Sequence, residues 1–196
     1  MSYLKKMEYE IVLKDSFWII RNCPKCGRKT YFKNTNKFRV NANGNKLDIW
    51  LIYQCEECKH TLNLSIYERR KICSIPKEDY QCFLNNDEQF AEMHGKNVQL
   101  FRKNKATIDF EKVNYDFVKL HETMEYGDFE GQIVIAVNNP YQLKIRPEKQ
   151  IAEILGLSRS QVKNLLEKGE MEVKTELPQF ISVSINACRF HMDNTW

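Results

Sequence analysis

Two cysteine pairs at identical spacing are the residues of this chain with the clearest chemistry. Cys23 and Cys26 stand in the segment CPKCG, and Cys55 and Cys58 stand in CEECK. A C-x-x-C turn presents two sulfur atoms from one tight reversal of the backbone, and two such turns supply the four thiolates of a tetrahedral Zn²⁺ site. We therefore predict that these four cysteines bind a structural zinc ion.

The spacing alone leaves other uses of the four thiols open. Iron in a rubredoxin-like site needs the same four ligands, and the cysteines could also be buried or redox-active thiols. Thioredoxin-like redox sites use one C-x-x-C at the start of a helix, whereas Cys26 is followed by GRKTYFKN, which is typical of a turn that leads into a strand. Four thiolates fill the coordination shell of zinc and leave no position for a catalytic water.

The other cysteines and a nearby histidine carry weaker signals. His60, two residues after Cys58, is an alternative ligand that a complete set of four thiolates makes unnecessary. A nucleophilic pair of Cys82 and His94 lacks an evident third group to orient it. We expect the isolated cysteines to be small buried apolar side chains: Cys73, Cys82 and Cys188.

Strands must position the two cysteine turns. KFRVNAN and KLDIWLIYQC flank an Asn43-Gly44 turn signal, and TLNLSIY alternates apolar and polar residues. EIVLKDSFWIIRNC is expected to add an entering strand with Trp18 in the core. Residues 1–72 are therefore predicted to form an antiparallel zinc ribbon, with both cysteine turns at one end of a small sheet.

This segment resembles a known family. KFRVNANGNKLDIWLIYQCEEC, downstream of CPKCG, is similar to a bacterial family catalogued as domain of unknown function 1062, and the resemblance extends over most of the chain. It implies a zinc ribbon followed by a helical linker and a C-terminal segment. It implies no established activity.

The middle of the chain, residues 73–140, is predicted to be a connector of helices followed by strands. Helical periodicity runs from Ser74 to about Lys105, with a break at Gly95. KVNYDFVKLHE and IVIAV are typical of strands, and NNP ends the second. With the ribbon before it and a two-helix unit in residues 141–196, the chain is predicted to be an α+β protein of three segments.

The last segment carries a second informative pattern. IRPEKQIAEILGLSRSQVKNLLEKGEMEV reads as two amphipathic helices, with Ser158 as the N-cap of the second and Gly169 at its end. It resembles the alpha-L RNA-binding motif of a small-subunit ribosomal protein, pseudouridine synthases and tyrosyl-tRNA synthetases. Two features depart from that motif: Pro147-Glu148 replaces Leu-Asp, and the segment after Val173 lacks Val-Asn-Gly.

The motif predicts contacts with structured RNA, such as ribosomal or transfer RNA, through phosphate groups. A helix N-terminus attracts phosphate, and basic side chains add charge-assisted contacts whose affinity falls with salt. The candidate RNA-binding residues are Arg146, Lys149, Ser158, Arg159, Ser160, Lys163 and Lys168. The same helices also fit a helix-turn-helix DNA reader or an ordinary solvated surface. A third alternative is a protein–protein adaptor, with the ribbon as a docking surface and the acidic middle segment as a partner site.

Composition and charge exclude several classes. With 42% hydrophobic and 29% charged residues, the chain can fold without being disordered, and it contains no apolar run long enough to span a membrane. Its charge of +4 is uneven, because residues 1–72 carry 15 basic against 7 acidic residues, which points to phosphates or acidic partners. The start of the chain lacks the apolar segment of a signal peptide, so we expect a cytoplasmic protein. No P-loop, paired carboxylates or open metal site indicates an enzyme or a small-molecule substrate.

Overall fold

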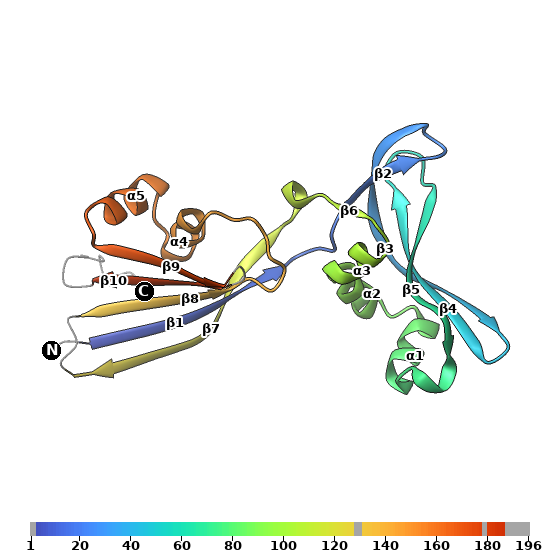
Figure 1. The fold of residues 1–196 in the computed structure, drawn as a ribbon, viewed down its shortest axis with the longest axis horizontal. Coiled ribbons are helices and arrows are strands. Elements are labelled where there is room, and N and C mark those ends of the chain that lie inside the picture. Colours follow the sequence, from blue (N-terminus) through green and yellow to red (C-terminus); the bar gives the residue numbers. More distant parts are fainter. Residues whose placement is uncertain (1–2, 128–130, 178–179, 187–196) are drawn as a thin grey trace. The chain divides into compact units, whose positions relative to one another are not determined.

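The protein is an α+β protein of two compact units. The computed structural model describes residues 3–127, 131–177 and 180–186 (Figure 1). One unit, here called the terminal unit, consists of Met1–Val12 and Asp116–Trp196, and the other, the inserted unit, consists of Leu13–Tyr115. Each unit has its own five-stranded sheet and is described by itself. No helix in the described ranges has both the length and the apolar character that crossing a bilayer requires.

The inserted unit is built on an antiparallel sheet of strand order β5-β4-β3-β2-β6. Its strands are β2 (Ile19–Cys23), β3 (Arg28–Asn43), β4 (Lys46–Cys55), β5 (Thr61–Lys71) and β6 (Thr107–Ile108). The predicted hairpin is confirmed: Asn43 pairs with Lys46 across a turn in which Gly44 has φ of +61°. Positive φ is costly for residues with a Cβ, which explains the glycine.

This sheet has a buried inner face and an exposed outer face. Along β4 the odd-numbered residues are at most 1% exposed, whereas the even-numbered residues remain partly accessible. The register extends this division to β3, where Phe38 pairs with Leu51 on the inner face and Arg39 pairs with Trp50 on the outer face. Because side chains alternate in a strand, the sheet buries one side and presents the other to solvent.

Short helices cover the inner face, in the region where helical periodicity was predicted (Figure 1). They are α1 (Lys77–Asn85), α2 (Glu88–Gly95) and α3 (Val98–Lys103), with the 3₁₀ turns η1 (Ile72–Ser74) and η2 (Phe110–Lys112). Aromatic rings join helices and sheet: Phe83 of α1 lies edge-on to Phe38, with centroids 4.8 Å apart, and Phe101 of α3 packs against Tyr53 at 5.8 Å. Such pairs add specific geometry to apolar burial.

Helix α2 approaches β3 with no room for a side chain at Gly95. The Gly95 carbonyl accepts the N–H of Phe17 at 2.9 Å, and Asn34 donates to Ser16 Oγ at 2.9 Å and to the carbonyl of Ala91 at 3.0 Å. A Cβ built on Gly95 would lie 2.5 Å from Asn34 Nδ2 and 2.7 Å from Ser16 Cβ. The predicted break at Gly95 is therefore also a point of close docking.

The terminal unit has a mixed sheet of order β7-β1-β8-β10-β9. Its strands are β1 (Tyr3–Leu13), β7 (Tyr115–Tyr126), β8 (Gln132–Asn138), β9 (Met171–Leu177) and β10 (Phe180–Asn186), and its helices are α4 (Pro147–Leu155) and α5 (Arg159–Glu167). β1 runs parallel to β8, and β10 runs antiparallel to both β8 and β9. The helix pair contributes Ile151, Val162 and other buried side chains to the core of this unit.

Two details differ from the sequence-based expectation. The segment expected to be one entering strand is two strands: β1 joins the terminal sheet, and only β2 joins the sheet of the inserted unit. Phe17 is buried in place of the expected Trp18, which stays half-exposed beside the ammonium of Lys112. The bounds of the two compact units differ from those of the three predicted segments, since helices α1–α3 belong to the inserted unit and β7 and β8 to the terminal sheet.

Candidate functional site

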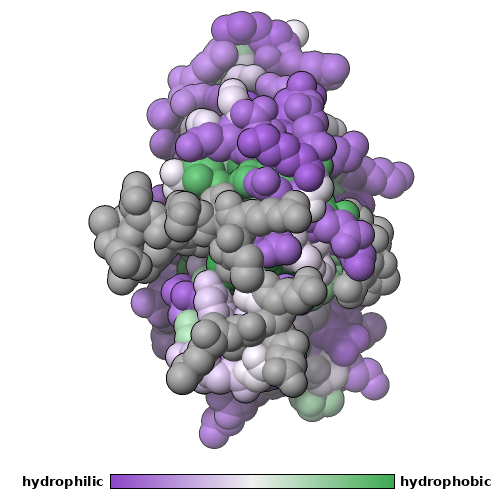
Figure 2. All heavy atoms as spheres, turned by 90° about the vertical axis from the view of Figure 1, so that its left-hand side faces the viewer, coloured by the Kyte–Doolittle hydropathy of each residue, from purple (hydrophilic) through white to green (hydrophobic). Residues whose placement is uncertain are grey.

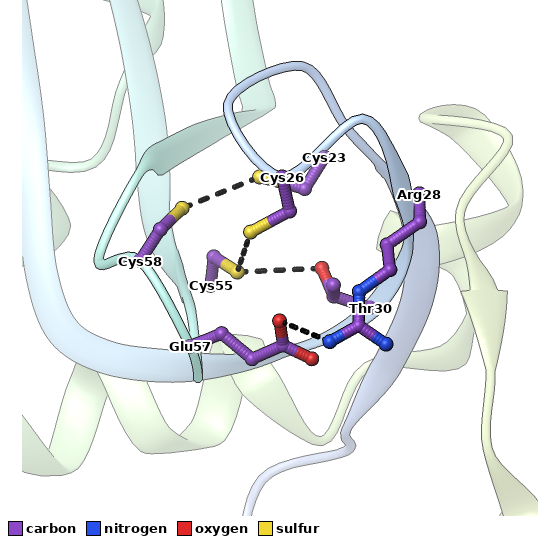
Figure 3. Close-up of polar contacts among 7 residues, drawn as sticks. All are labelled: Cys23, Cys26, Arg28, Thr30, Cys55, Glu57 and Cys58. Carbon is purple, nitrogen blue, oxygen red and sulfur yellow. Dashed lines mark hydrogen bonds and ion pairs between the residues drawn. The ribbon is translucent and has the colours of Figure 1, made fainter.

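The four paired cysteines lie at the ends of strands in the inserted unit. Cys23 ends β2 and Cys55 ends β4, and each is followed by a turn that carries the second cysteine of its pair (Figure 3). The Gly27 N–H donates to the Cys23 carbonyl at 2.9 Å, and the Lys59 N–H donates to the Cys55 carbonyl at 3.1 Å. Gly27 and Lys59 have φ of +70° and +63°, so the two turns share one backbone design. A glycine adopts positive φ at little cost, which suits Gly27 to its position.

The four sulfur atoms form one compact group. Cys23 Sγ lies 3.4 Å from Cys58 Sγ, and Cys26 Sγ lies 3.9 Å from Cys55 Sγ. All four sulfurs lie within 4.8 Å of one another, which makes them a group that could hold a metal ion. A tetrahedron with Zn–S bonds of about 2.3 Å has S···S edges of about 3.8 Å, in the middle of these distances. A disulfide would need about 2.05 Å, so the sulfurs are not paired covalently.

Hydrogen bonds around Cys55 favour its thiolate form. Thr30, on the inner face of β3, places its hydroxyl 3.3 Å from Cys55 Sγ. Burial raises the pKa of Cys55, but the backbone N–H of Cys58, the Thr30 hydroxyl and the backbone N–H of Glu57 together lower it to about 6. The contact with Cys58, followed by burial, raises the pKa of Cys26. Thiols packed this closely resist a second negative charge, which a bound cation would compensate.

An ion pair lies beside the four sulfurs and links the two cysteine turns. Arg28, just after the first turn, donates to Glu57 of the second turn at 2.8 Å, so an ion pair links the two turns (Figure 3). Both partners are largely exposed, so this pair contributes less than about 1 kcal/mol. His60 is exposed and is not in the sulfur group, although its carbonyl accepts the N–H of Cys55 at 2.8 Å.

The remaining cysteines behave differently from the expectation of burial. Cys73 is exposed and Cys82 is half-buried, because both lie at the surface of the helical layer rather than under it. His94 packs edge-on to Phe90 with centroids 4.7 Å apart, and burial lowers its pKa. Cys188 lies outside the described residues.

Removing the Thr30 hydroxyl is predicted to make the site release metal at a higher pH. In a Thr30→Val variant the Cys55 thiolate loses a hydrogen bond, so its pKa rises and protons displace the metal more readily as the pH falls. We expect the pH of half-release to rise by about 0.5. A chromogenic chelator in a pH series measures it, with Thr61→Val on β5 as the control. An unchanged midpoint would show that Thr30 does not stabilise the thiolate.

The candidate RNA-binding residues lie on and beside α4 and α5. Ser158 is the N-cap of α5, as predicted, and Arg146 is the N-cap of α4. Gly156 and Gly169 follow the two helices with φ of +65° and +68°. The Ser158 hydroxyl accepts the N–H of Gln161, whose side chain accepts the N–H of Ser158 in return. This capping box already satisfies two N–H groups that a phosphate could otherwise use.

The cations of this helix pair fall into two groups. Lys149 and Lys163 each lie 3.5 Å from a glutamate one turn later in the same helix, Glu153 and Glu167. The exposed cations without an ion pair to any described residue are Arg146, Arg159 and Lys168. Figure 2 views the molecule from the side on which Figure 1 draws the terminal unit, and hydrophilic atoms cover much of the face that it shows.

Two features of the candidate metal site were not predicted from sequence. Thr30 is an ordinary strand residue by type, and only its register position, two before the Phe32 that pairs with Cys55, identifies it as an inner-face neighbour of the sulfurs. In the second turn the residue with positive φ is Lys59, so no glycine marks this position in the sequence. Both depend on how β3 and β4 pair.

Comparison with known proteins identifies a family. A family model described as "Protein of unknown function (DUF1062)" matches residues 40–177, a range that includes Cys55 and Cys58 and begins after Cys23 and Cys26. No curated protein and no solved structure shows a significant match. The matched range covers more than half of the sequence and runs through parts of both units. The chain therefore belongs to the DUF1062 family.

Proposed function

We propose that the protein is a non-enzymatic zinc-binding protein that contacts structured RNA, such as ribosomal or transfer RNA. The zinc ion would be held by Cys23, Cys26, Cys55 and Cys58 and would fix the ends of β2 and β4 together. The observation that supports zinc is the group of four sulfurs with separations from 3.4 Å to within 4.8 Å. Four thiolates close the coordination sphere, so the ion would stabilise the fold and leave recognition to other surfaces.

The observation that supports RNA contact is the presence of a free arginine at the start of each helix of the α4–α5 pair. Arg146 caps α4 and Arg159 is the first residue of α5, and both are exposed without an ion pair to a described residue. A guanidinium group at a helix N-terminus adds its charge to the helix dipole, and arginine binds phosphate with two parallel hydrogen bonds. The paired Lys149 and Lys163 would contribute less, because a neighbouring glutamate offsets each charge.

Removing the two arginines is predicted to weaken RNA binding. An Arg146→Ala/Arg159→Ala variant should bind bulk transfer RNA about tenfold more weakly than the unchanged protein, with a salt slope lower by about two. Electrophoretic shift in a salt series measures both quantities. Lys77→Gln/Arg102→Gln, which removes the same charge from the inserted unit, is the control and should bind normally.

The same assay distinguishes RNA binding from DNA binding by this helix pair. Absence of binding to transfer and ribosomal RNA at low salt would overturn the proposal. Tighter binding to duplex DNA than to structured RNA would replace it with the helix-turn-helix reading. Stoichiometric iron instead of zinc in the purified protein would correct the metal but not its structural role.

A further inference from the structure

The outer face of the sheet in the inserted unit carries an unbalanced positive charge. Strands β2, β3 and β4 contain one carboxylate, Asp48, which accepts the backbone N–H of Arg69 at 2.8 Å. The same strands contain seven basic residues: Arg21, Arg28, Lys29, Lys33, Lys37, Arg39 and Lys46. These strands therefore carry seven of the fifteen basic residues found in residues 1–72.

Strand alternation places three of these cations on the outer face. Lys29 and Lys33 flank the buried residues Thr30 and Phe32 along β3, and Lys33 pairs with Gln54. Arg39, beyond the irregularity in β3, pairs with Trp50 on the same face. All three cations are exposed and make no ion pair with a described residue. Their charge is therefore available to an anionic partner.

Aromatic rings lie among these cations. Tyr31, between Lys29 and Lys33, is 37% exposed, and Trp50 is half-exposed opposite Arg39. Lys112 places its ammonium 3.6 Å from the centre of the Tyr31 ring and 4.7 Å from that of Trp18, so it occupies one face of Tyr31 and leaves the other face for a base. Cations interleaved with accessible rings on an open sheet combine two functions, since the cations follow a phosphate backbone while the rings stack against bases.

The helical layer on the inner face has no such excess. Residues 77–105 contain five carboxylates and five basic residues: Glu78, Asp79, Asp87, Glu88 and Glu92, and Lys77, Lys96, Arg102, Lys103 and Lys105. A polyanion is therefore attracted to the outer face of the sheet more strongly than to the helical side. This charge complementarity selects a polyanion over an acidic or neutral apolar surface as the partner.

We infer that this outer face binds a single-stranded polynucleotide. Lys29, Lys33 and Arg39 contact successive phosphates, and unpaired bases stack on Tyr31 and Trp50. Base faces are accessible to such rings only when they are not enclosed in a duplex, which is why the partner is single-stranded. The inference deepens the proposed function by assigning a second surface, in the other unit, to the unpaired parts of a nucleic acid.

A charge variant tests this surface in the full, metal-loaded chain. Lys29→Gln/Lys33→Gln/Arg39→Gln should bind labelled oligo(U) and oligo(dT) of about twenty nucleotides at least about tenfold more weakly near 100 mM salt, with a salt slope lower by about two. Fluorescence anisotropy measures both quantities, and comparison of the two oligomers separates RNA from DNA as the source. The matched control is Lys77→Gln/Arg102→Gln/Lys105→Gln, which should bind within about twofold of the unchanged protein.

A second variant tests the stacking. Trp50→Leu should weaken binding about fivefold or more while leaving the salt slope unchanged, because no phosphate contact is lost. Tyr31→Ser, at a more exposed position, should act in the same direction and keeps the test valid if Trp50→Leu unfolds. Circular dichroism verifies that each variant is folded.

The outcomes separate this inference from the proposed function. Failure of both oligomers to bind at low salt, or equal loss in the charge variant and its control, overturns the inference. If transfer RNA still binds and depends on Arg146 and Arg159, the proposed function survives that result. Two results together would separate the surfaces: the oligomers bind through the outer face, and the Arg146→Ala/Arg159→Ala variant binds transfer RNA normally. They would support the inference and contradict RNA binding by the helix pair.

Discussion

Loss of the metal is expected to unfold the inserted unit. A Cys55→Ser variant, or the unchanged protein treated with a strong chelator, should lose the near-ultraviolet signal of the inserted unit and its cooperative thermal transition. The apparent free energy of a structural zinc site is about 10–16 kcal/mol, which is as large as the total stability of about 5–15 kcal/mol typical of a domain. Cys55 is fully buried at the end of β4, and a serine hydroxyl there is a much weaker zinc ligand than a thiolate.

The exposed Cys73 supplies the control for this experiment. Cys73→Ser changes the same atom at an exposed position of η1 and should leave the transition unchanged. The terminal unit contains none of the four ligands, so its backbone amides should keep their protection from hydrogen exchange when the metal is removed. A Cys55→Ser protein with normal exchange protection throughout residues 13–115 would show that the sulfurs do not brace this unit.

Adding a single methyl group at Gly95 is expected to destabilise the inserted unit by about 3 kcal/mol. Helix propensity alone predicts the opposite sign, because alanine is favoured over glycine by about 1 kcal/mol within a helix. The new Cβ would collide with Asn34 Nδ2 and Ser16, and it would disturb the two hydrogen bonds that Asn34 donates. Urea unfolding of Gly95→Ala measures the sign and the size.

A double variant identifies the collision as the cause. Ser16→Gly removes two of the three nearest atoms, so Gly95→Ala should cost about 1–2 kcal/mol less in that background than in the unchanged protein. The exposed Met93→Ala, two residues earlier in α2, should change the free energy of unfolding by less than about 0.5 kcal/mol. A neutral or stabilising Gly95→Ala would contradict the close docking of α2 on β3.

Local patterns predicted most elements but not their assembly. The turn at Asn43-Gly44, the alternation along KLDIWLIYQC and the capping residue Ser158 each specify a structure within a few residues, and the structure has all three. The allocation of β1 was missed, because its alternating pattern fits any sheet with one buried face. Its parallel pairing with β8 joins Leu4 to Gln132, a contact that no local pattern contains.

For the candidate metal site, the sequence predicted the four ligands but not the contacts around them. The C-x-x-C spacing identifies four sulfurs because two residues between cysteines allow both to face one point, and the structure brings them together. The Thr30 contact with Cys55 depends on strand register, and the Arg28–Glu57 pair depends on the approach of two turns. Neither is encoded in the order of neighbouring residues.

The division of the terminal unit between both ends of the chain has a consequence for its synthesis. β1 leaves the ribosome before the strands it pairs with, since its neighbour β8 begins at Gln132 and the strand beyond that, β10, ends at Asn186. We therefore expect the nascent β1 to keep an open edge while the intervening Leu13–Tyr115 is translated and folds. If the four sulfurs bind the metal proposed above, folding would start in the interior of the chain, and a delay in metal delivery would prolong the interval in which β1 is prone to aggregate.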